Sequence, residues 1–523
     1  MVDQGKTEFE NVDSSVSKTE QKPTGLTRRT FTGGLALAPF SVSAARAATN
    51  PTDPSVFSGA QLVSAYRDRS LSAPEVVTAI FKRISDVGQS VNAFVVTDEE
   101  GAMQQAQASA ARWKSGNPLG PLDGMPVTIK DNIPVAGIPA RKGSRTASDT
   151  PVVENAPAAA RLITGGAIVL GKTCMPEFGW KAVGDSPLTG ITRNPWNTKV
   201  TTGGSTAGGS AAAALNLGVV HVGTDGAGSI RIPSSFCGVF GIKPSYGRIP
   251  TVPAGATFHI GPVSRTVRDA AALLQTLAGY DPQDLTSLNV PVGDLLGSLD
   301  SGVKGMRVAW SPRLGYIEKL DPEVESVTTQ AAQSFAGMGA TVEKVDPGFP
   351  NPISILEPIW LTICWTIVRG IPEARWNEVD PGLLALAMKG RNVSAADYAT
   401  AIGARAVLHA KLARFNERYD LLLTPTLATP AFEVGHNTPP DGEFGDDWLN
   451  WAPYTYPFNL IPSSCQPAVW FHARRTADWP SNRRTIPARG HGVTSGPRLR
   501  AGASLALHRQ AETGLGTSCE CRS

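Results

Sequence analysis

A lysine at the end of an apolar run is the first feature of this sequence that could carry out chemistry. Lys130 follows the apolar residues 127–129 inside the stretch 124–132. Burying an ammonium group is costly, so a lysine there is either paired or neutral, and a neutral lysine can act as a base. A strand-end lysine that simply reaches water is the commoner arrangement, so this stretch alone gives only a candidate base.

Two glycine-rich stretches each contain a serine. Residues 202–210 include Ser205 and lead into a run of small residues. Such a stretch could bind an anion at a helix N-terminus. It lacks the Gly-Lys-Ser/Thr sequence that ends a phosphate-binding loop. Residues 223–233 include Ser229 and directly follow an apolar run. Small residues there let several backbone N–H groups converge on one point, as in an oxyanion hole, and make Ser229 a candidate nucleophile. Taken alone, either stretch could instead be a purely structural turn.

Alternating strand and helix patterns surround these residues. Short apolar runs predict strands at 127–129, 167–170, 219–222, 306–310, 341–345 and 421–423. The spacing of apolar residues and of capping residues predicts helices at 72–88, 158–164, 266–279 and 322–338, with Thr266 as an N-cap. This order predicts a largely parallel or mixed sheet covered by helices on both faces.

The composition excludes several classes of protein. The 48 basic and 45 acidic side chains give a net charge of +3, and no basic block has the size that nucleic-acid binding requires. Six cysteines are too few and too scattered for a disulfide scaffold. Hydrophobic residues make up 41% of the chain, but none of its apolar runs reaches the roughly 18 residues of a membrane span. A large globular α/β enzyme remains.

Residues 1–47 have the order of an export signal. The arginine pair 28–29 is followed by a short apolar run at 33–45 and by a small-residue site at 45–47. This order resembles the twin-arginine type of bacterial signal peptide, which carries folded proteins across membranes. We therefore expect an exported protein, in the periplasm or outside the cell. The alternative is a disordered tail with a chance arginine pair, and hence a cytoplasmic protein.

Taken together, the three reactive stretches resemble the amidase signature family. Lys130, Ser205 and Ser229 stand in that family's motifs, and the two serines are 24 residues apart, as is usual there. The likeness covers roughly residues 55–460. It includes the further motifs at 231–233, 236–238, 241–244, 247–248, 261–262, 265–269 and 423–426.

The resemblance implies the amidase signature fold, a single large α/β domain with a central mixed β-sheet covered by helices on both faces. Residues 48–120 would form an N-terminal helical segment and residues 121–460 the signature core. The implied substrate is a small-molecule amide. Neither a metal nor an organic cofactor is implied, nor is a nucleic acid or a stable membrane span, and a homodimer is a possible assembly.

The resemblance also implies a mechanism, in which a carboxylic acid amide is hydrolysed to the acid and ammonia or an amine. Ser229 would be the nucleophile that forms an acyl-enzyme. Ser205, with an unusual cis peptide bond, would relay the proton, and Lys130 would be the base. These residues make up a Ser-cisSer-Lys triad.

The oxyanion hole is assigned by the same resemblance to backbone N–H groups. They belong to Gly226, Ala227 and Gly228, together with the nucleophile, and each is worth roughly 3 kcal/mol of the barrier. Three positions depart from the commoner family pattern: Ala227 replaces a frequent glycine, Thr206 a usual serine and Cys174 a common asparagine. Ala227 keeps its N–H, so the hole survives where the backbone suits a β-carbon. Cys174 is expected to be a buried small residue and not a second nucleophile.

The tail, residues 461–523, departs furthest from the family. It holds nine arginines and no lysine, with three of the seven histidines and three of the six cysteines. We hypothesise translation out of frame after about residue 460, and a genuine divergent tail is the alternative. A frameshift would remove sheet strands and leave a catalytically impaired family member, which resequencing the gene would test.

A second function would use the same catalytic residues. The chain could be the glutaminase (A-type) subunit of a tRNA-dependent amidotransferase, which requires partner subunits and a cytoplasmic location. The export signal at residues 1–47 favours a stand-alone amidase.

Overall fold

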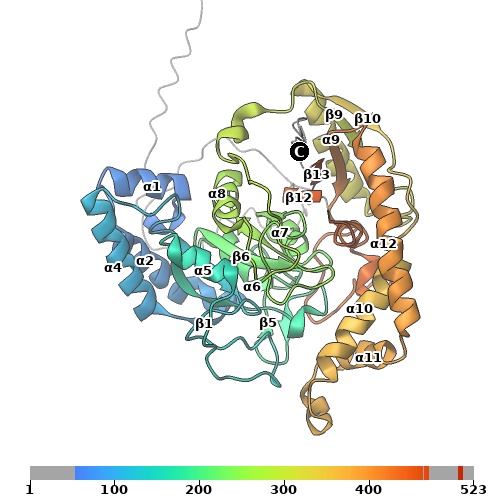
Figure 1. Cartoon of the computed structure of the whole chain (residues 1–523), viewed down its shortest axis with the longest axis horizontal. Coiled ribbons are helices and arrows are strands. Elements are labelled where there is room, and N and C mark those ends of the chain that lie inside the picture. The colour runs from blue at the N-terminus through green and yellow to red at the C-terminus, as the bar shows by residue number, and fades with distance from the viewer. Residues whose placement is uncertain (1–52, 463, 470–504, 511–523) are drawn as a thin grey trace, which may run out of the picture. The chain divides into compact units, whose positions relative to one another are not determined.

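The computed structural model describes residues 53–462, 464–469 and 505–510 (Figure 1). The chain divides into Met1–Asn50 and Pro51–Ser523, and every described residue belongs to the second unit. The expected signal at residues 1–47 and most of the tail, residues 461–523, lie outside the described residues.

A mixed sheet of eleven strands organises the described unit, in the order β1-β3-β2-β6-β8-β7-β12-β13-β11-β9-β10. The edge pair β1–β3 is antiparallel, the pairs β3–β2, β2–β6, β11–β9 and β9–β10 are parallel, and antiparallel pairs join the strands between β6 and β11. The strands are β1 (Phe94–Thr97), β2 (Pro126–Lys130), β3 (Ile168–Thr173), β6 (Val220–Asp225), β7 (Phe240–Lys243), β8 (His259–Ser264), β9 (Arg307–Trp310), β10 (Thr341–Lys344), β11 (Leu421–Pro425), β12 (Ser464–Val469) and β13 (Leu505–Gln510). A separate small sheet pairs β4 (Asp185–Ser186) with β5 (Gly190–Ile191).

Helices pack around this sheet in a single large α/β domain (Figure 1). They are α1 (Gly59–Arg67), α2 (Ala73–Arg83), α3 (Gln89–Val91), α4 (Glu99–Ser115), α5 (Pro157–Thr164), α6 (Ala207–Ala214), α7 (Arg231–Cys237), α8 (Val267–Leu277), α9 (Pro322–Gly337), α10 (Ile353–Val368), α11 (Pro381–Gly390) and α12 (Ala395–Asn416). Figure 1 shows α1, α2 and α4 at the end of the sheet that carries β1, and α10 to α12 at the opposite side. Two large apolar clusters fill the layers between helices and sheet.

The elements predicted from apolar patterns are confirmed. The six predicted strands correspond to β2, β3, β6, β9, β10 and β11, and the four predicted helices to α2, α5, α8 and α9. Thr266 caps α8 as expected, because its side chain accepts the Asp269 N–H at 3.1 Å. The first predicted helix changes form before its end, since α2 stops at Arg83 and one π-helical turn, Ile84–Gly88, completes it.

Two short segments of the tail form strands of this sheet, β12 and β13. β12 pairs antiparallel with β7, and β13 pairs antiparallel with both β12 and β11. These two strands therefore occupy the middle of the sheet, where they join its two halves. Translation out of frame stays a hypothesis.

Strand geometry brings two candidate stretches to the same edge of the sheet. β2 and β6 are parallel neighbours, with Val127 opposite Val220 and Ile129 opposite Val222. Their carboxyl ends therefore meet, and these ends carry Lys130 and the turn that follows β6. The stretch that contains Ser205 continues into α6, and its small residues let α6 lie close to the sheet. A β-carbon on Gly208 of α6 would collide with a backbone oxygen just before β1.

Candidate active site

Lys130 and Ser205 meet in the interior of the domain. Lys130 is fully buried at the end of β2, and its Nζ donates to Ser205 Oγ at 2.7 Å. Its Nζ is also within hydrogen-bond distance of Thr224 Oγ1 at 2.8 Å, Thr206 Oγ1 at 3.2 Å and the Thr224 backbone oxygen at 3.3 Å. The Gly204–Ser205 peptide bond is cis, as the resemblance implied. Thr206, one of the departures from the family pattern, therefore keeps the hydroxyl that the lysine contacts.

Burial favours the neutral form of Lys130. It lowers the pKa of Lys130 well below the ordinary lysine value, and the charge of Asp225 opposes this effect without cancelling it. Lys130 forms no ion pair with a carboxylate of the described residues. A neutral amine that hydrogen-bonds a serine hydroxyl can accept a proton from it.

Ser229 lies in the turn between β6 and α7, beside these two residues. Its backbone oxygen accepts the Thr206 N–H at 2.9 Å, which holds the two serine-bearing stretches together. The Ser229 side chain retains 9% exposure and forms no hydrogen bond with the described residues. The structure thus joins Lys130 to Ser205 by a side-chain hydrogen bond and holds the Ser229 backbone against Thr206, the residue that follows Ser205.

The Gly228 N–H, which the resemblance assigned to the oxyanion hole, already has a hydrogen-bond acceptor. It donates to Asp225 Oδ1 at 2.8 Å, and the Ile230 N–H donates to the other carboxylate oxygen at 3.1 Å. Asp225, at the end of β6, thus accepts hydrogen bonds from two amides of the glycine-rich turn.

The remaining amides of the turn stay available. Among the described residues, the N–H groups of Gly226, Ala227 and Ser229 have no hydrogen-bond acceptor. Ala227 has a negative φ, since it is not among the non-glycine residues with positive φ. Its β-carbon is therefore compatible with the turn, and this departure from the family pattern leaves the backbone donors in place.

A buried ion pair between Arg231 and Asp225 stabilises the turn between β6 and α7. Arg231 is 1% exposed and donates to Asp225 in bidentate fashion, from Nε at 3.0 Å and from Nη2 at 2.9 Å. Burial alone would raise the pKa of Asp225, but the Arg231 charge and hydrogen bonds from Arg231 and Asn459 hold it far below its usual range. Asn459 was not predicted from the sequence as a residue that supports the site. The sequence shows there only a single asparagine after the aromatic-rich segment 454–458.

We expect Arg231→Met to destabilise the fold by about 3–5 kcal/mol, because it leaves the Asp225 carboxylate buried without its counter-ion. Chemical denaturation of the purified variant measures this loss. Arg268→Met is the matched control, since Arg268 is half-exposed and pairs with the exposed Asp300, so that its loss should cost less than about 1 kcal/mol. Equal stabilities of the two variants would contradict a structural role for the buried pair.

Aromatic rings cover one side of the turn. A β-carbon placed on Gly226 would lie 3.5 Å from Trp360 Cζ3 and 3.7 Å from Phe258 Cδ2, so both rings contact that backbone. Trp360 also packs edge-on against Trp448, with 6.0 Å between ring centres. The Trp360 Nε1–H is buried and has no acceptor among the described residues. An apolar wall with one free donor therefore borders the turn.

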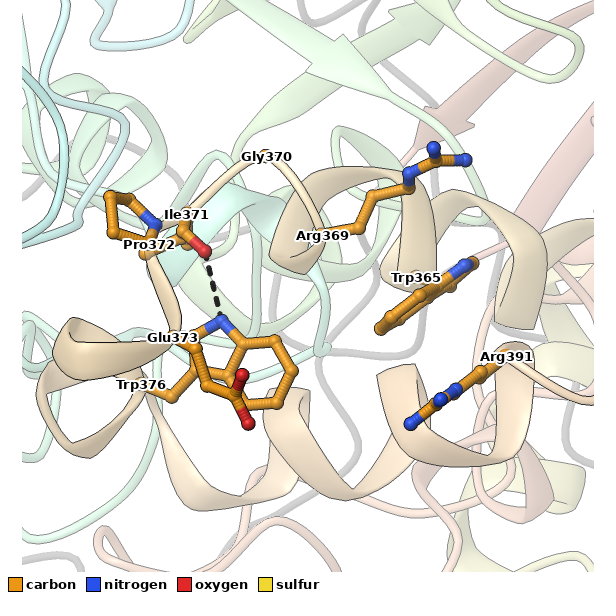
Figure 2. Close-up of a pocket in the computed structure, with 8 residues that line it drawn as sticks. All are labelled: Trp365, Arg369, Gly370, Ile371, Pro372, Glu373, Trp376 and Arg391. Atoms are coloured by element: carbon orange, nitrogen blue, oxygen red, sulfur yellow. Dashed lines mark hydrogen bonds between the residues drawn. The ribbon is translucent and has the colours of Figure 1, made fainter.

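Trp365 lies elsewhere, although it shares helix α10 with Trp360. It lines a separate pocket at the ends of α10 and α11, which Figure 2 shows together with Arg391 beside the Trp365 ring. The volume of this pocket is about 620 Å³, and Arg391 Cζ lies 5.9 Å from the centre of that ring. In the same pocket the Trp376 Nε1–H donates to the Ile371 oxygen at 3.0 Å. None of the residues lining this pocket belongs to the three reactive stretches, so Trp365 is not part of the site.

Cys174 and His221 are both buried. Burial raises the pKa of Cys174 to about 12, which makes its thiol a poor nucleophile, as expected for that position. Burial lowers the pKa of His221 to about 3, and its Nδ1 pairs with Thr128 Oγ1 at 2.8 Å. No group of three or more potential metal ligands occurs among the described residues. In the same residues, no helix combines the length and apolarity of a membrane span.

Known proteins share both the sequence and the fold. Residues 75–470 match the family model for amidases. An acylamidase of Rhodococcus erythropolis is 35% identical over 437 residues, which span 80% of this chain and 89% of that protein. The A-type subunit of the glutamyl-tRNA(Gln) amidotransferase of Geobacter metallireducens is 32% identical over 415 residues, 72% of this chain and 84% of that protein. The crystal structure of a bacterial aryl acylamidase of the amidase signature family aligns with a TM-score of 0.75 at 25% identity, covering 87% of this chain and 92% of that one. The chain therefore belongs to the amidase signature family and is an amidase, an enzyme that hydrolyses amide C–N bonds.

Proposed function

We propose that this amidase hydrolyses a small-molecule carboxylic acid amide to the acid and ammonia or an amine, through an acyl-enzyme on Ser229. Ser205 relays the proton between Ser229 and Lys130, which is the base. The observation that carries the proposal is the Lys130 amine, fully buried, without a carboxylate partner among the described residues, and 2.7 Å from Ser205 Oγ.

The proposed reaction balances its protons in two halves. Ser229 Oγ attacks the amide carbonyl carbon, and its proton passes through Ser205 to Lys130 Nζ. The oxyanion is stabilised by the unpaired N–H groups of the turn. As the C–N bond breaks, Lys130 returns the proton through Ser205 to the leaving nitrogen. Water then attacks the acyl-enzyme along the same proton route and releases the acid.

An apolar acyl group suits the wall of this site better than glutamine does. Glutamine carries an ammonium and a carboxylate, and the rings of Trp360 and Phe258 offer these charges only one hydrogen-bond donor, the Trp360 Nε1–H, and no charged partner. The similarity to an acylamidase supports the same choice. The order of residues 1–47 supports export, which a tRNA-dependent amidotransferase does not need. We therefore favour a stand-alone amidase for aromatic or bulky apolar amides over a glutaminase subunit.

The purified full chain is expected to release amine from anilides and aromatic amides with a kcat/KM about tenfold or more above that for glutamine, because each buried unpaired charge opposes binding. Colorimetric detection of released aniline measures kcat/KM for anilides, and detection of released ammonia measures kcat/KM for aromatic amides and for glutamine. Exclusive glutamine hydrolysis, or turnover that begins only when amidotransferase partner subunits are added, would contradict the stand-alone assignment.

A further inference from the structure

One peptide unit of the oxyanion turn is held at both ends. The Ala227 oxygen accepts a hydrogen bond from Thr455 Oγ1 at 2.6 Å. The N–H of the same peptide, which belongs to Gly228, donates to Asp225 Oδ1 at 2.8 Å. The plane of the Ala227–Gly228 peptide is therefore fixed by two partners on opposite sides.

This peptide lies between two of the available donors. The Ala227 N–H precedes it and the Ser229 N–H follows it, so a displacement of this peptide moves the backbone that carries both donors. Gly228 has a φ of +131°, a conformation in which glycine moves with little steric cost. The turn therefore cannot hold its donors in place by local sterics alone and depends on outside partners.

The two partners of this peptide, Thr455 and Asp225, belong to one hydrogen-bond network. That network includes residues of the segment just before residue 461. The Thr455 oxygen accepts Arg231 Nη1 at 2.8 Å, so the residue that holds the Ala227 oxygen is itself held by the ion pair. One short 3-10 turn later, Asn459 Nδ2 donates to the backbone oxygen of Asp225 at 3.0 Å and to its Oδ1 at 2.9 Å. Thr455 and Asn459 are 1% and 0% exposed, so water does not substitute for them.

We propose that Thr455 is a positioning residue of the amidase reaction. Its hydroxyl holds the Ala227–Gly228 peptide in the orientation that aims the Ala227 and Ser229 N–H groups at the oxyanion. Thr455 acts through the turn, whose Ala227 oxygen its hydroxyl contacts. This role rests on the proposed function, since it has meaning only for a reaction at Ser229.

The test compares Thr455→Val, Thr455→Ser and the control Thr328→Val in the full chain. Thr328 is a fully buried threonine of α9, and its hydroxyl likewise donates to a backbone oxygen, that of Val324 at 2.6 Å. We expect Thr455→Val to lower kcat about tenfold or more while KM stays within about twofold, because a ground-state amide needs the oxyanion donors least. Affinity for an aldehyde inhibitor, which forms a tetrahedral adduct with serine, should fall by the same factor as kcat/KM.

The controls separate positioning from general stability. Thr455→Ser, which keeps the hydroxyl, should restore most of the lost kcat, and Thr328→Val should lose similar stability yet keep wild-type kcat. The role is overturned if Thr455→Val keeps wild-type kcat and aldehyde affinity, if serine fails to rescue, or if Thr328→Val loses as much kcat. A folded wild-type chain that hydrolyses none of the amides overturns the proposed function itself and this role with it.

Discussion

Ser229→Ala is expected to lower kcat for amide hydrolysis by on the order of 10⁴-fold or more while the fold stays intact. Without the hydroxyl no acyl-enzyme forms, and only the binding of the substrate and the oxyanion donors remain to assist attack by water. The structure also explains why stability should hardly change. The Ser229 hydroxyl has no hydrogen-bond partner among the described residues, so its removal leaves no buried group unsatisfied.

Steady-state kinetics on an anilide, together with mass spectrometry of the chain after a slow-reacting ester, measure both halves of this prediction. Wild type should gain the mass of one acyl group, and Ser229→Ala should not. Ser235→Ala is the matched control, because Ser235 lies in α7 close by and is also 9% exposed. Activity above about a tenth of wild type in Ser229→Ala would exclude it as the nucleophile and redirect attention to Ser205.

The position of Lys130 and Ser205 could be predicted, because the information is local. An apolar run of three residues marks the strand β2 and leaves the lysine at its end, and closely spaced glycines mark the turn around Ser205. Parallel pairing of β2 with β6 then brings Lys130 to the edge where the Ser229 turn begins. Each of these steps follows from a pattern of a few residues and one rule of sheet geometry.

The orientation of individual groups could not be predicted, because it depends on contacts between distant residues. The Gly228 N–H donates to Asp225, whose side chain bends back toward the turn that follows it. The partner of the Ala227 oxygen, Thr455, comes 228 residues later in the chain. No local pattern marks such a pair, so the sequence located the turn but could not say which of its amides face the substrate.

The two tryptophans of α10 also show that the orientation of a side chain could not be predicted from the sequence. Trp360 and Trp365 are five residues apart, which corresponds to about 140° around a helix. Only one of them can therefore face the site, and only the packing of α10 shows that it is Trp360.

Lys130→Met is the second large prediction, since it should lower kcat by about a thousandfold and also change how stability depends on pH. Methionine fills most of the same volume but cannot accept the proton that Ser205 relays. Wild-type kcat/KM should rise with pH as Lys130 loses its proton, because only the neutral amine is a base. The variant should lack this rise. Lys82→Met, which replaces a lysine that is 74% exposed, should keep wild-type kcat.

The stability effect has a definite sign. The pKa of Lys130 is lowered in the folded chain and is about 10.4 in the unfolded chain, so between these two values unfolding takes up a proton. Within that window the free energy of unfolding of wild type therefore rises with pH, by up to about 1.4 kcal/mol per pH unit relative to Lys130→Met. Titration of other groups, such as Lys172, whose pKa is lowered to about 8, is common to both chains and cancels in the difference. Urea unfolding at several pH values measures it. Equal pH dependence of the two chains would mean that Lys130 stays charged when folded, and a charged Lys130 cannot be the base of the proposed reaction.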